Sequence, residues 1–411
     1  MLRQENSVQL GNSTVASQSI ECGTSIASHK PLVIVLSGSN HCSTCLRVTT
    51  LKHCAKCKEI AYCSISCQKT GWIDACHKAW CGKEADDWTD DERLIARLGY
   101  IMQIPGTEQR IFEGLLESND CDISMRIADR IAAKTGFLKC NIRCWARKNL
   151  RNSFTILDDC FREIGLGVYP SASANYNHSC WPNAIYFFKG RDLVIKAIRD
   201  LEPNTEIQIA YLDIRKPEQE RKTYLKEVYS FDCICEACEG FGWMRGLGEL
   251  RRTADSQDRM IGNIDNYLTL ARLSIDNILE NRTNISFDWL SLEINQFSSV
   301  PQLFNYMAIR LCSEAFEDSL EQQDWPKATK YGLLVLNFYL HVLPFGYPVT
   351  GIFAGDLCAV MFNERHLQKT GEDISFMKRI VEFARWNLQK TIGGSLLDNV
   401  DIVMEELDKL T

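Results

Sequence analysis

The chain has 411 residues, of which 45% are hydrophobic and 24% charged, as expected for a globular protein of two or three domains. Its net charge of -7 argues against binding bulk nucleic acid through the whole surface and suits basic peptide substrates. The 19 cysteines fall mostly at metal-ligand spacings, so we expect a reducing compartment rather than a disulfide framework. The N-terminus lacks an apolar run, so no signal peptide is expected.

The first stretch of the chain predicts β-strands. The run Pro31–Leu36 has the length and branched composition of a strand, and Gly23 marks a turn before it. A buried β-hairpin is the simplest structure for this pattern.

The strongest pattern in the chain is a set of eight potential zinc ligands. They fall in four closely spaced pairs: Cys42 and Cys45, Cys54 and Cys57, Cys63 and Cys67, and His77 and Cys81. Two tetrahedral zinc ions would use all eight, and a segment with so little apolar content depends on metal for its folding free energy. Spacing alone allows sequential or interleaved pairing, and Cys76 is an alternative to His77. Such closed sites are structural, so any function of this segment lies in binding a partner.

Helices are predicted next, followed by strands. From about Asp91 to Lys139, apolar residues recur at three- and four-residue steps. Strands are then predicted at 152–156, 193–200 and 206–213.

The most informative segment is Asn-His-Ser-Cys-Trp-Pro-Asn at 177–183. Asn177 and His178 can present an amide and an imidazole to the edge of a bound ring. Downstream, Cys233, Cys235 and Cys238 lack a fourth zinc ligand nearby, and Cys180 is the obvious upstream ligand. A metal held in this way would connect two distant parts of the chain.

The remaining chain predicts a stack of helices, at about 264–279, 304–316, 326–340, 353–362 and 374–388. Tyr331–Gly355 contains no charged residue, but polar residues and two prolines interrupt it. This pattern favours two buried helices around a break over a membrane span.

These motifs resemble the SET and MYND-domain family of lysine methyltransferases, in which a MYND zinc finger splits the SET core. The resemblance is carried by Asn177–Asn183, Ile209–Asp213, Phe231–Cys238 and, in the finger, Tyr62–Ser64 with Gly71–Trp72. It implies an α+β fold: a β-rich SET core with a threaded C-terminal segment, an inserted finger, a helical insert, and an all-α, tetratricopeptide-like C-terminal lobe. The implied divisions are 1–41 (N-terminal SET part), 42–81 (MYND finger), 82–150 (helical insert), 151–228 (C-terminal SET core), 229–240 (post-SET zinc cluster) and 241–411 (helical lobe).

The resemblance also implies site residues. In the finger it implies interleaved sites, with Cys42, Cys45, Cys63 and Cys67 on one zinc and Cys54, Cys57, His77 and Cys81 on the other. For the methyl donor, S-adenosylmethionine, it implies contacts from Gly11, Asn12, Asn152, Asn177, His178, Tyr211 and Phe231. Tyr211 matches the catalytic tyrosine that orients the target amine, and Tyr229 and Phe231 would line the substrate channel.

Two residues near the N-terminus depart from the family pattern in the part that would meet the methyl donor. Ser13 replaces the second glycine of a Gly-x-Gly turn, where a Cβ would obstruct a close backbone approach or a positive φ. Leu10 stands where the family often has a basic residue that could meet the carboxylate of the methyl donor.

The resulting prediction is S-adenosylmethionine-dependent methylation of lysine in histone or non-histone proteins, with three structural zinc ions. The alternative is a catalytically silent scaffold that recruits partners through the MYND finger. Expected partners are a protein with an exposed lysine and peptides bound by the finger. We expect a monomer in the cytoplasm and nucleus, with no membrane insertion and no strong nucleic-acid binding, because no recognition helix is evident.

Overall fold

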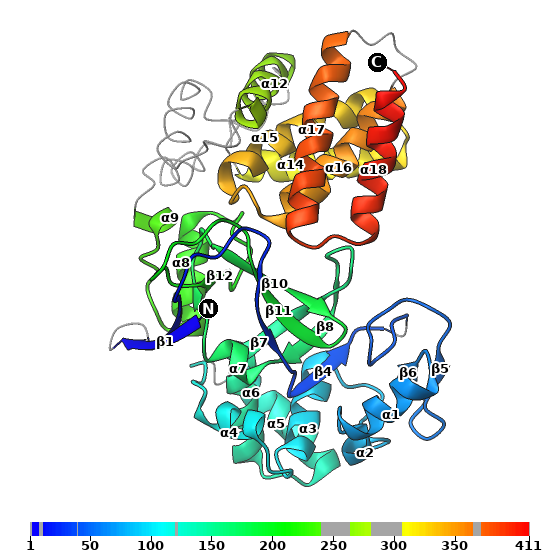
Figure 1. The fold of residues 1–411 in the computed structure, drawn as a ribbon. Coiled ribbons are helices and arrows are strands. Elements are labelled where there is room, and N and C mark those ends of the chain that lie inside the picture. Colours follow the sequence, from blue (N-terminus) through cyan, green and yellow to red (C-terminus); the bar gives the residue numbers. More distant parts are fainter. Residues whose placement is uncertain are drawn as a thin grey trace.

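A computed structural model describes residues 2–7, 11–38, 40–119, 122–239, 264–280, 306–364 and 371–410. Small sheets with flanking helices form the lower part of the molecule in Figure 1, and helices alone form the upper part. This arrangement confirms the predicted α+β class with a helical C-terminal lobe. Leu10, the start of the helix predicted at 304, and the boundary at 240–241 lie outside the described residues.

The sheets join strands that are far apart in the sequence. One sheet has the order β10 (Ala184–Lys189), β11 (Asp192–Ala197), β3 (Ser25–His29), and another has the order β4 (Val33–Leu36), β8 (Glu163–Val168), β7 (Ser153–Leu157). The hairpin considered for the first residues is wrong, because β3 and β4 lie in different sheets. The remaining pairs are β1 (Leu2–Ser7) with β2 (Gly11–Ala16), β5 (Lys52–His53) with β6 (Ala61–Tyr62), and β9 (Asn177–His178) with β12 (Gln208–Ile209).

The strand predicted at 206–213 shortens to the two residues of β12, which pairs in parallel with β9. This pairing places Ile209 opposite His178 and brings the following residue pair, Ala210 and Tyr211, to the end of β9. Buried apolar side chains beneath these strands, including Ile156, Ile195 and Ile209, form the core of the sheet region.

The finger segment leaves the sheet after β4 and returns at α3 (Asp90–Ile101). Its short helices are α1 (Ile65–Ile73) and α2 (His77–Trp80). Ser37 and Asp90 flank the segment, and the Ser37 hydroxyl donates to the Asp90 carboxylate at 2.5 Å. The two connections of the finger to the rest of the protein therefore lie side by side.

Helices of the insert pack below the sheets in Figure 1. They are α3, α4 (Thr107–Gly114), α5 (Asp122–Thr135) and α6 (Lys139–Asn152). Thr89 and Glu92 form a reciprocal capping box that begins α3. The apolar periodicity ended near Lys139 and did not indicate α6, although the implied helical insert extends to 150; the last residue of α6, Asn152, directly precedes β7.

Around the 177–183 segment the chain forms short elements: α7 (Pro170–Ser173), α8 (Glu218–Tyr224), the π-helical turn η1 (Leu225–Tyr229) and α9 (Glu236–Glu239).

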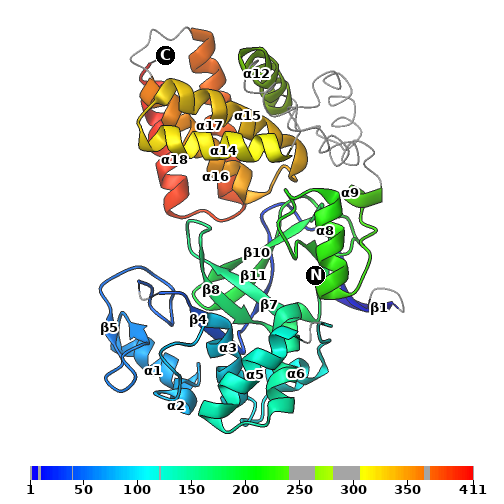
Figure 2. The same ribbon diagram turned by 180° about the vertical axis from the view of Figure 1, so that it is seen from behind.

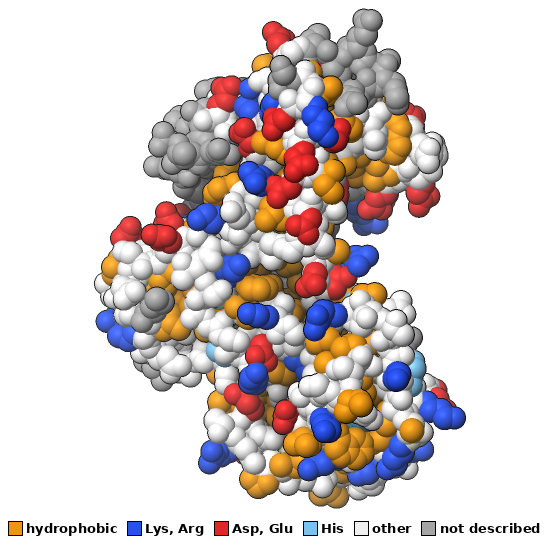
Figure 3. Space-filling view, turned by 45° about the vertical axis from the view of Figure 1, so that its right-hand side comes forward, with side chains coloured by type: hydrophobic (Ala, Val, Ile, Leu, Met, Phe, Trp, Pro, Cys, Tyr) orange, Lys and Arg blue, Asp and Glu red, His pale blue; other side chains and the backbone are white. Residues whose placement is uncertain are grey.

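The helical lobe forms one body above the sheets in both Figure 1 and the reverse view of Figure 2. Its described helices are α12 (Ile264–Glu280), α14 (Tyr306–Glu321), α15 (Trp325–Val342), α16 (Pro348–Asn363), α17 (Gly371–Lys390) and α18 (Ser395–Asp408). The apolar stretch at 331–355 divides into α15 and α16 around a break, as predicted. Among the described helices, none combines the length and hydropathy needed to cross a bilayer. Acidic and basic side chains lie interspersed over the face of this lobe drawn in Figure 3.

Candidate functional site

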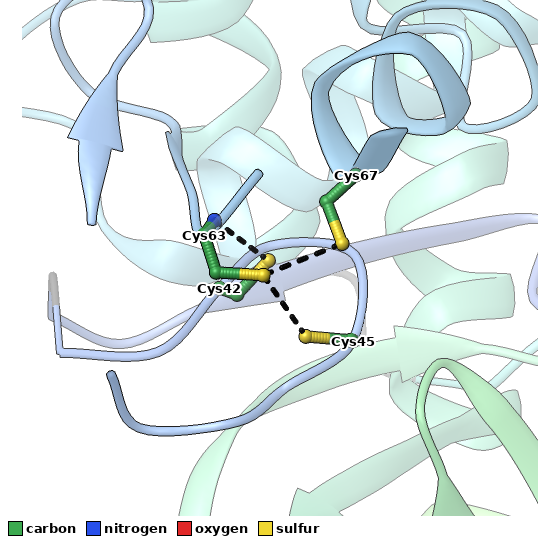
Figure 4. Close-up of side chains that lie close together, drawn as sticks. All are labelled: Cys42, Cys45, Cys63 and Cys67. Carbon is green, nitrogen blue, oxygen red and sulfur yellow. Dashed lines mark hydrogen bonds between the residues drawn. The ribbon is translucent and has the colours of Figure 1, made fainter. Parts of the chain in front are cut away.

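The first cysteine cluster brings together two pairs of cysteines that lie about twenty residues apart in the finger. Cys42, Cys45, Cys63 and Cys67 point toward one another in Figure 4, and their sulfur atoms all lie within 4.8 Å. Ser64 caps α1 by accepting a hydrogen bond from the Cys67 backbone N–H at 3.1 Å, which places Cys63 and Cys67 on the same side. The Sγ–Sγ distance between them is 3.5 Å.

A second cluster contains Cys54, Cys57, His77 and Cys81, with all ligand atoms within 4.8 Å. His77 Nε2 faces the Cys57 sulfur at 3.4 Å, and its Nδ1 lies 2.8 Å from the Tyr62 hydroxyl. Burial lowers the pKa of His77 to about 4, which keeps the ring neutral and able to ligate a metal. Of the two alternatives for this ligand position, His77 lies in the cluster and Cys76 does not.

The third cluster joins Cys180 to the cysteines that follow Phe231. Its members are Cys180, Cys233, Cys235 and Cys238, again within 4.8 Å of one another. The Cys180 backbone N–H donates to the Cys235 sulfur at 3.3 Å, and the buried Arg221 Nε donates to the Cys180 sulfur at 3.2 Å. A guanidinium directed at a sulfur favours the thiolate form, which is the form that binds metal.

A cavity of about 510 Å³ lies beside the third cluster. We call it the Tyr211 cavity. Seven of the residues predicted to contact the donor or the substrate line this cavity: Asn12, Asn152, Asn177, His178, Tyr211, Tyr229 and Phe231. Residues more than two hundred positions apart therefore meet in one concave site.

His178 connects the third cluster to Tyr211. The Tyr211 backbone N–H donates to His178 Nδ1 at 3.0 Å, so Nδ1 is an acceptor. Burial lowers the pKa of His178 to about 4, and the neutral ring therefore carries its proton on Nε2, which faces the Cys180 sulfur at 3.2 Å. Both ring nitrogens have partners within the protein, and His178 also lines the Tyr211 cavity, so contact of its ring with a bound ligand stays a prediction.

Three aromatic rings form one wall of the Tyr211 cavity. Tyr211 and Tyr229 have ring centroids 4.8 Å apart, and Tyr229 and Phe231 have centroids 6.4 Å apart. The Tyr211 hydroxyl donates to the Tyr176 carbonyl. Burial raises the pKa of Tyr211 and of Tyr229, so both phenols remain protonated near neutral pH.

Two asparagine amides are held by neighbouring groups. Asn177 Nδ2 donates to Glu206 at 2.7 Å and to the Asn12 carbonyl at 3.3 Å. Asn152 Nδ2 donates to the carbonyls of Leu116 and Lys148. Since both N–H groups of each amide are used, the amide oxygens are the atoms left to meet a ligand.

The structure shows the backbone conformation at Ser13, which replaces a glycine of the family pattern. Ser13 lies inside β2, buried and without a positive φ, and is not part of the cavity lining. Gly11 is also in β2, opposite Ser7. The structure therefore does not require glycine at position 13 for backbone conformation.

The sequence did not identify three residues that support the site: Arg151, Tyr176 and Glu206. Arg151 and Tyr176 line the Tyr211 cavity, and Glu206 fixes Asn177. None of the three belongs to a local motif. Tyr176 directly precedes the 177–183 segment and Glu206 lies close to Ile209–Asp213, which is the only local signal for either residue.

Comparison with known proteins agrees with this geometry. A family model described as the SET domain matches residues 13–212. N-lysine methyltransferase SMYD2-B of Xenopus laevis is 27% identical over 360 residues, covering 80% of this chain and 82% of that protein. N-lysine methyltransferase SMYD2 of Homo sapiens is 27% identical over 327 residues, with coverage of 73% and 74%, and that of Mus musculus is 28% identical over 328 residues, with the same coverage. Residues 13–212 therefore match a SET domain, and these comparisons, with the three cysteine-rich clusters and the helical lobe, support a place for the chain in the SET and MYND-domain family of protein-lysine methyltransferases.

Proposed function

We propose that the protein transfers a methyl group from S-adenosylmethionine to the side-chain amine of a lysine in a protein substrate, and that the Tyr211 cavity is where this occurs. The observation that carries the proposal is the convergence of Asn12, Asn152, Asn177, Tyr211 and Phe231 on one cavity. Relatives named N-lysine methyltransferases support the reaction class.

The cavity fits such a donor in size and chemistry. Its volume of about 510 Å³ lies in the range of small-molecule sites, and its lining combines aromatic rings with amide oxygens. When bound, S-adenosylmethionine supplies an activated methyl group on a sulfonium. Aromatic faces such as those of Tyr229 and Phe231 attract cationic groups.

Tyr211 would orient the target amine. Its one phenolic proton is donated to the Tyr176 carbonyl, so its oxygen is left to accept a hydrogen bond from the amine. Burial keeps the phenol neutral, which argues against Tyr211 as a general base. The desolvated aromatic wall instead lowers the pKa of an entering ammonium group and favours its loss of a proton.

The three clusters would hold structural zinc. Cys₄, Cys₃His and Cys₄ sets with ligand atoms within 4.8 Å fit closed tetrahedral sites, which leave no position for a substrate. The two finger groupings are those of the interleaved arrangement. A Cys₄ zinc site carries a net negative charge, and the buried Arg221 beside Cys180 complements it.

Partner, compartment and division of the chain remain predictions. A protein substrate with an exposed lysine, histone or non-histone, and peptides bound by the finger are the partners we propose, with a monomeric protein in the cytoplasm and nucleus. The net charge of -7 favours basic peptide segments.

The test begins with binding. Zinc-loaded protein is titrated calorimetrically with S-adenosylmethionine and S-adenosylhomocysteine, and methyl transfer to core histones and to a pool of lysine-containing peptides is followed by mass spectrometry. A folded protein that binds neither molecule would overturn the proposal and favour the silent scaffold.

Tyr211→Phe separates chemistry from binding. We expect turnover to fall by about 10²- to 10³-fold while S-adenosylhomocysteine affinity changes by less than about twofold, because the lost hydroxyl acts on the amine. Tyr224→Phe is the matched control, since Tyr224 is 44% exposed and is not part of the cavity lining. Equal turnover in the two variants would contradict the role of Tyr211.

A further inference from the structure

One charged side chain enters the Tyr211 cavity. Arg151 lies in the last turn of α6, directly before Asn152, and lines the cavity near the rings of Tyr211 and Tyr229. Among the described residues of this lining, it alone carries a formal charge at neutral pH, because His178 is neutral. The cavity therefore presents a single cation among aromatic and amide groups.

No carboxylate neutralises this cation within the described part of the chain. The Arg151 Nη1 donates only to the Glu117 backbone carbonyl, at a long 3.5 Å. The Glu117 carboxylate instead pairs with Arg147, one turn earlier on α6. Burial lowers the pKa of Arg151, but a guanidinium remains charged throughout the physiological range.

The charges of the reactants decide what this guanidinium can bind. The donor carries a sulfonium, an ammonium and one carboxylate, and the other reactant, lysine, is also cationic before it loses its proton. A guanidinium would repel each of these groups except the carboxylate, with which it can form two parallel hydrogen bonds.

We propose that Arg151 binds the carboxylate of the methionine part of the donor. This inference rests on the proposed function of the Tyr211 cavity. The contact would hold the amino-acid end of the donor near α6, while the aromatic wall remains free for the cationic groups. Because Arg151 directly precedes Asn152, the helix α6 would place both a charged and an amide contact at the same end of the donor.

The experiment compares two ligands that differ in the amino-acid part. S-adenosylhomocysteine contains the carboxylate, whereas 5′-methylthioadenosine keeps the adenosine and thioether but lacks the whole amino-acid part. Calorimetric affinities of both are measured for the zinc-loaded full chain and for Arg151→Met and Arg151→Lys. Arg162→Gln is the matched control, because Arg162 pairs with Asp158 outside the cavity and its side chain is 70% exposed.

We expect Arg151→Met to weaken S-adenosylhomocysteine by about 10- to 100-fold and 5′-methylthioadenosine by less than about twofold. Arg151→Lys should lie between wild type and Arg151→Met, since it keeps the charge without the planar fork. The ratio of the two affinities within one sample is unaffected by a partly unfolded fraction, so imperfect folding of a variant leaves the comparison valid.

An equal loss for both ligands in Arg151→Met, or no loss for either, would overturn the role of Arg151 while leaving the proposed function intact. Tighter S-adenosylhomocysteine binding in that variant would do the same. Failure of the wild-type protein to bind both S-adenosylhomocysteine and S-adenosylmethionine would instead overturn the proposed function itself.

Discussion

A buried ion pair joins the finger segment to the core, and removing its acid should destabilise this junction severely. Glu84 follows the finger ligands and Arg97 lies on α3; their side chains are 1% and 5% exposed. Arg97 Nε and Nη2 donate to the Glu84 carboxylate at 2.5 and 2.9 Å, and Nη1 donates to the Ile34 carbonyl of β4 at 2.9 Å. The guanidinium also lies over the Trp80 ring, 3.8 Å from its centroid.

The substitution Glu84→Gln leaves the Arg97 charge buried without its anion, and such a loss costs about 3 to 5 kcal/mol. Arg97→Met should cost less than Glu84→Gln, because Arg93 also contacts Glu84, at 3.3 Å. In the double variant no unpaired charge from this pair remains, so its cost should fall well below the sum of the single costs.

The assay is urea unfolding of zinc-loaded protein, followed by circular dichroism and by zinc release to a chromophoric chelator. The exposed pair Lys30 and Asp192 provides the control, because Lys30 is 77% exposed on its side chain and Lys30→Ala should cost less than about 1 kcal/mol. A cost for Glu84→Gln no larger than that control, or strictly additive costs in the double variant, would refute the reasoning.

Three further outcomes are expected. Cys235→Ala should weaken S-adenosylhomocysteine binding measured by calorimetry, because it disrupts the cluster that holds Cys180, whose sulfur lies 3.2 Å from His178 Nε2; unchanged affinity would separate the cluster from the cavity. Tyr62→Phe should lower zinc affinity by about 10- to 100-fold in a chelator competition, since the Tyr62 hydroxyl lies 2.8 Å from Nδ1 of the ligand candidate His77. Burial lowers the pKa of His341 to about 4, so below pH 6.5 the unfolded chain takes up a proton that the folded chain refuses, and stability falls as the pH drops toward 4. At pH 5 this loss relative to pH 7 is about 2 kcal/mol, and urea unfolding should show His341→Leu to be less pH-dependent than wild type.

The sequence revealed those parts of the site whose signals are local. Cysteine and histidine ligands lie a few residues apart, so their spacing predicts metal clusters before any fold is known. Tyr211 was recognised because it belongs to a short motif, and its position beside His178 then follows from the parallel pairing of β9 and β12.

Other features depend on tertiary contacts that no short pattern records. In the sequence, Arg151 looks like an ordinary surface residue near the end of a polar segment. It lines the cavity only because α6 packs beside the aromatic wall in the folded protein. The same polar composition explains why apolar periodicity did not indicate α6, which only the resemblance placed in a helical insert; its buried residues include Lys148 and Asn149. The strand expected at 206–213 shortened because a sheet strand extends only as far as it has a partner, and β9 offers two residues.

The hydrogen bond between Ser37 and Asp90 brings together the two ends of the chain segment that contains the finger. A piece of chain whose ends lie close together can be lengthened or replaced by another while its attachment points stay in place, because bridging close ends carries little loop-closure entropy. Any replacement segment would have to supply a carboxylate and an aromatic ring for Arg97, as Glu84 and Trp80 do here. Chimaeras that trade this segment between related enzymes, while keeping those three side chains, offer a route to changing partner choice without redesigning the methylation site.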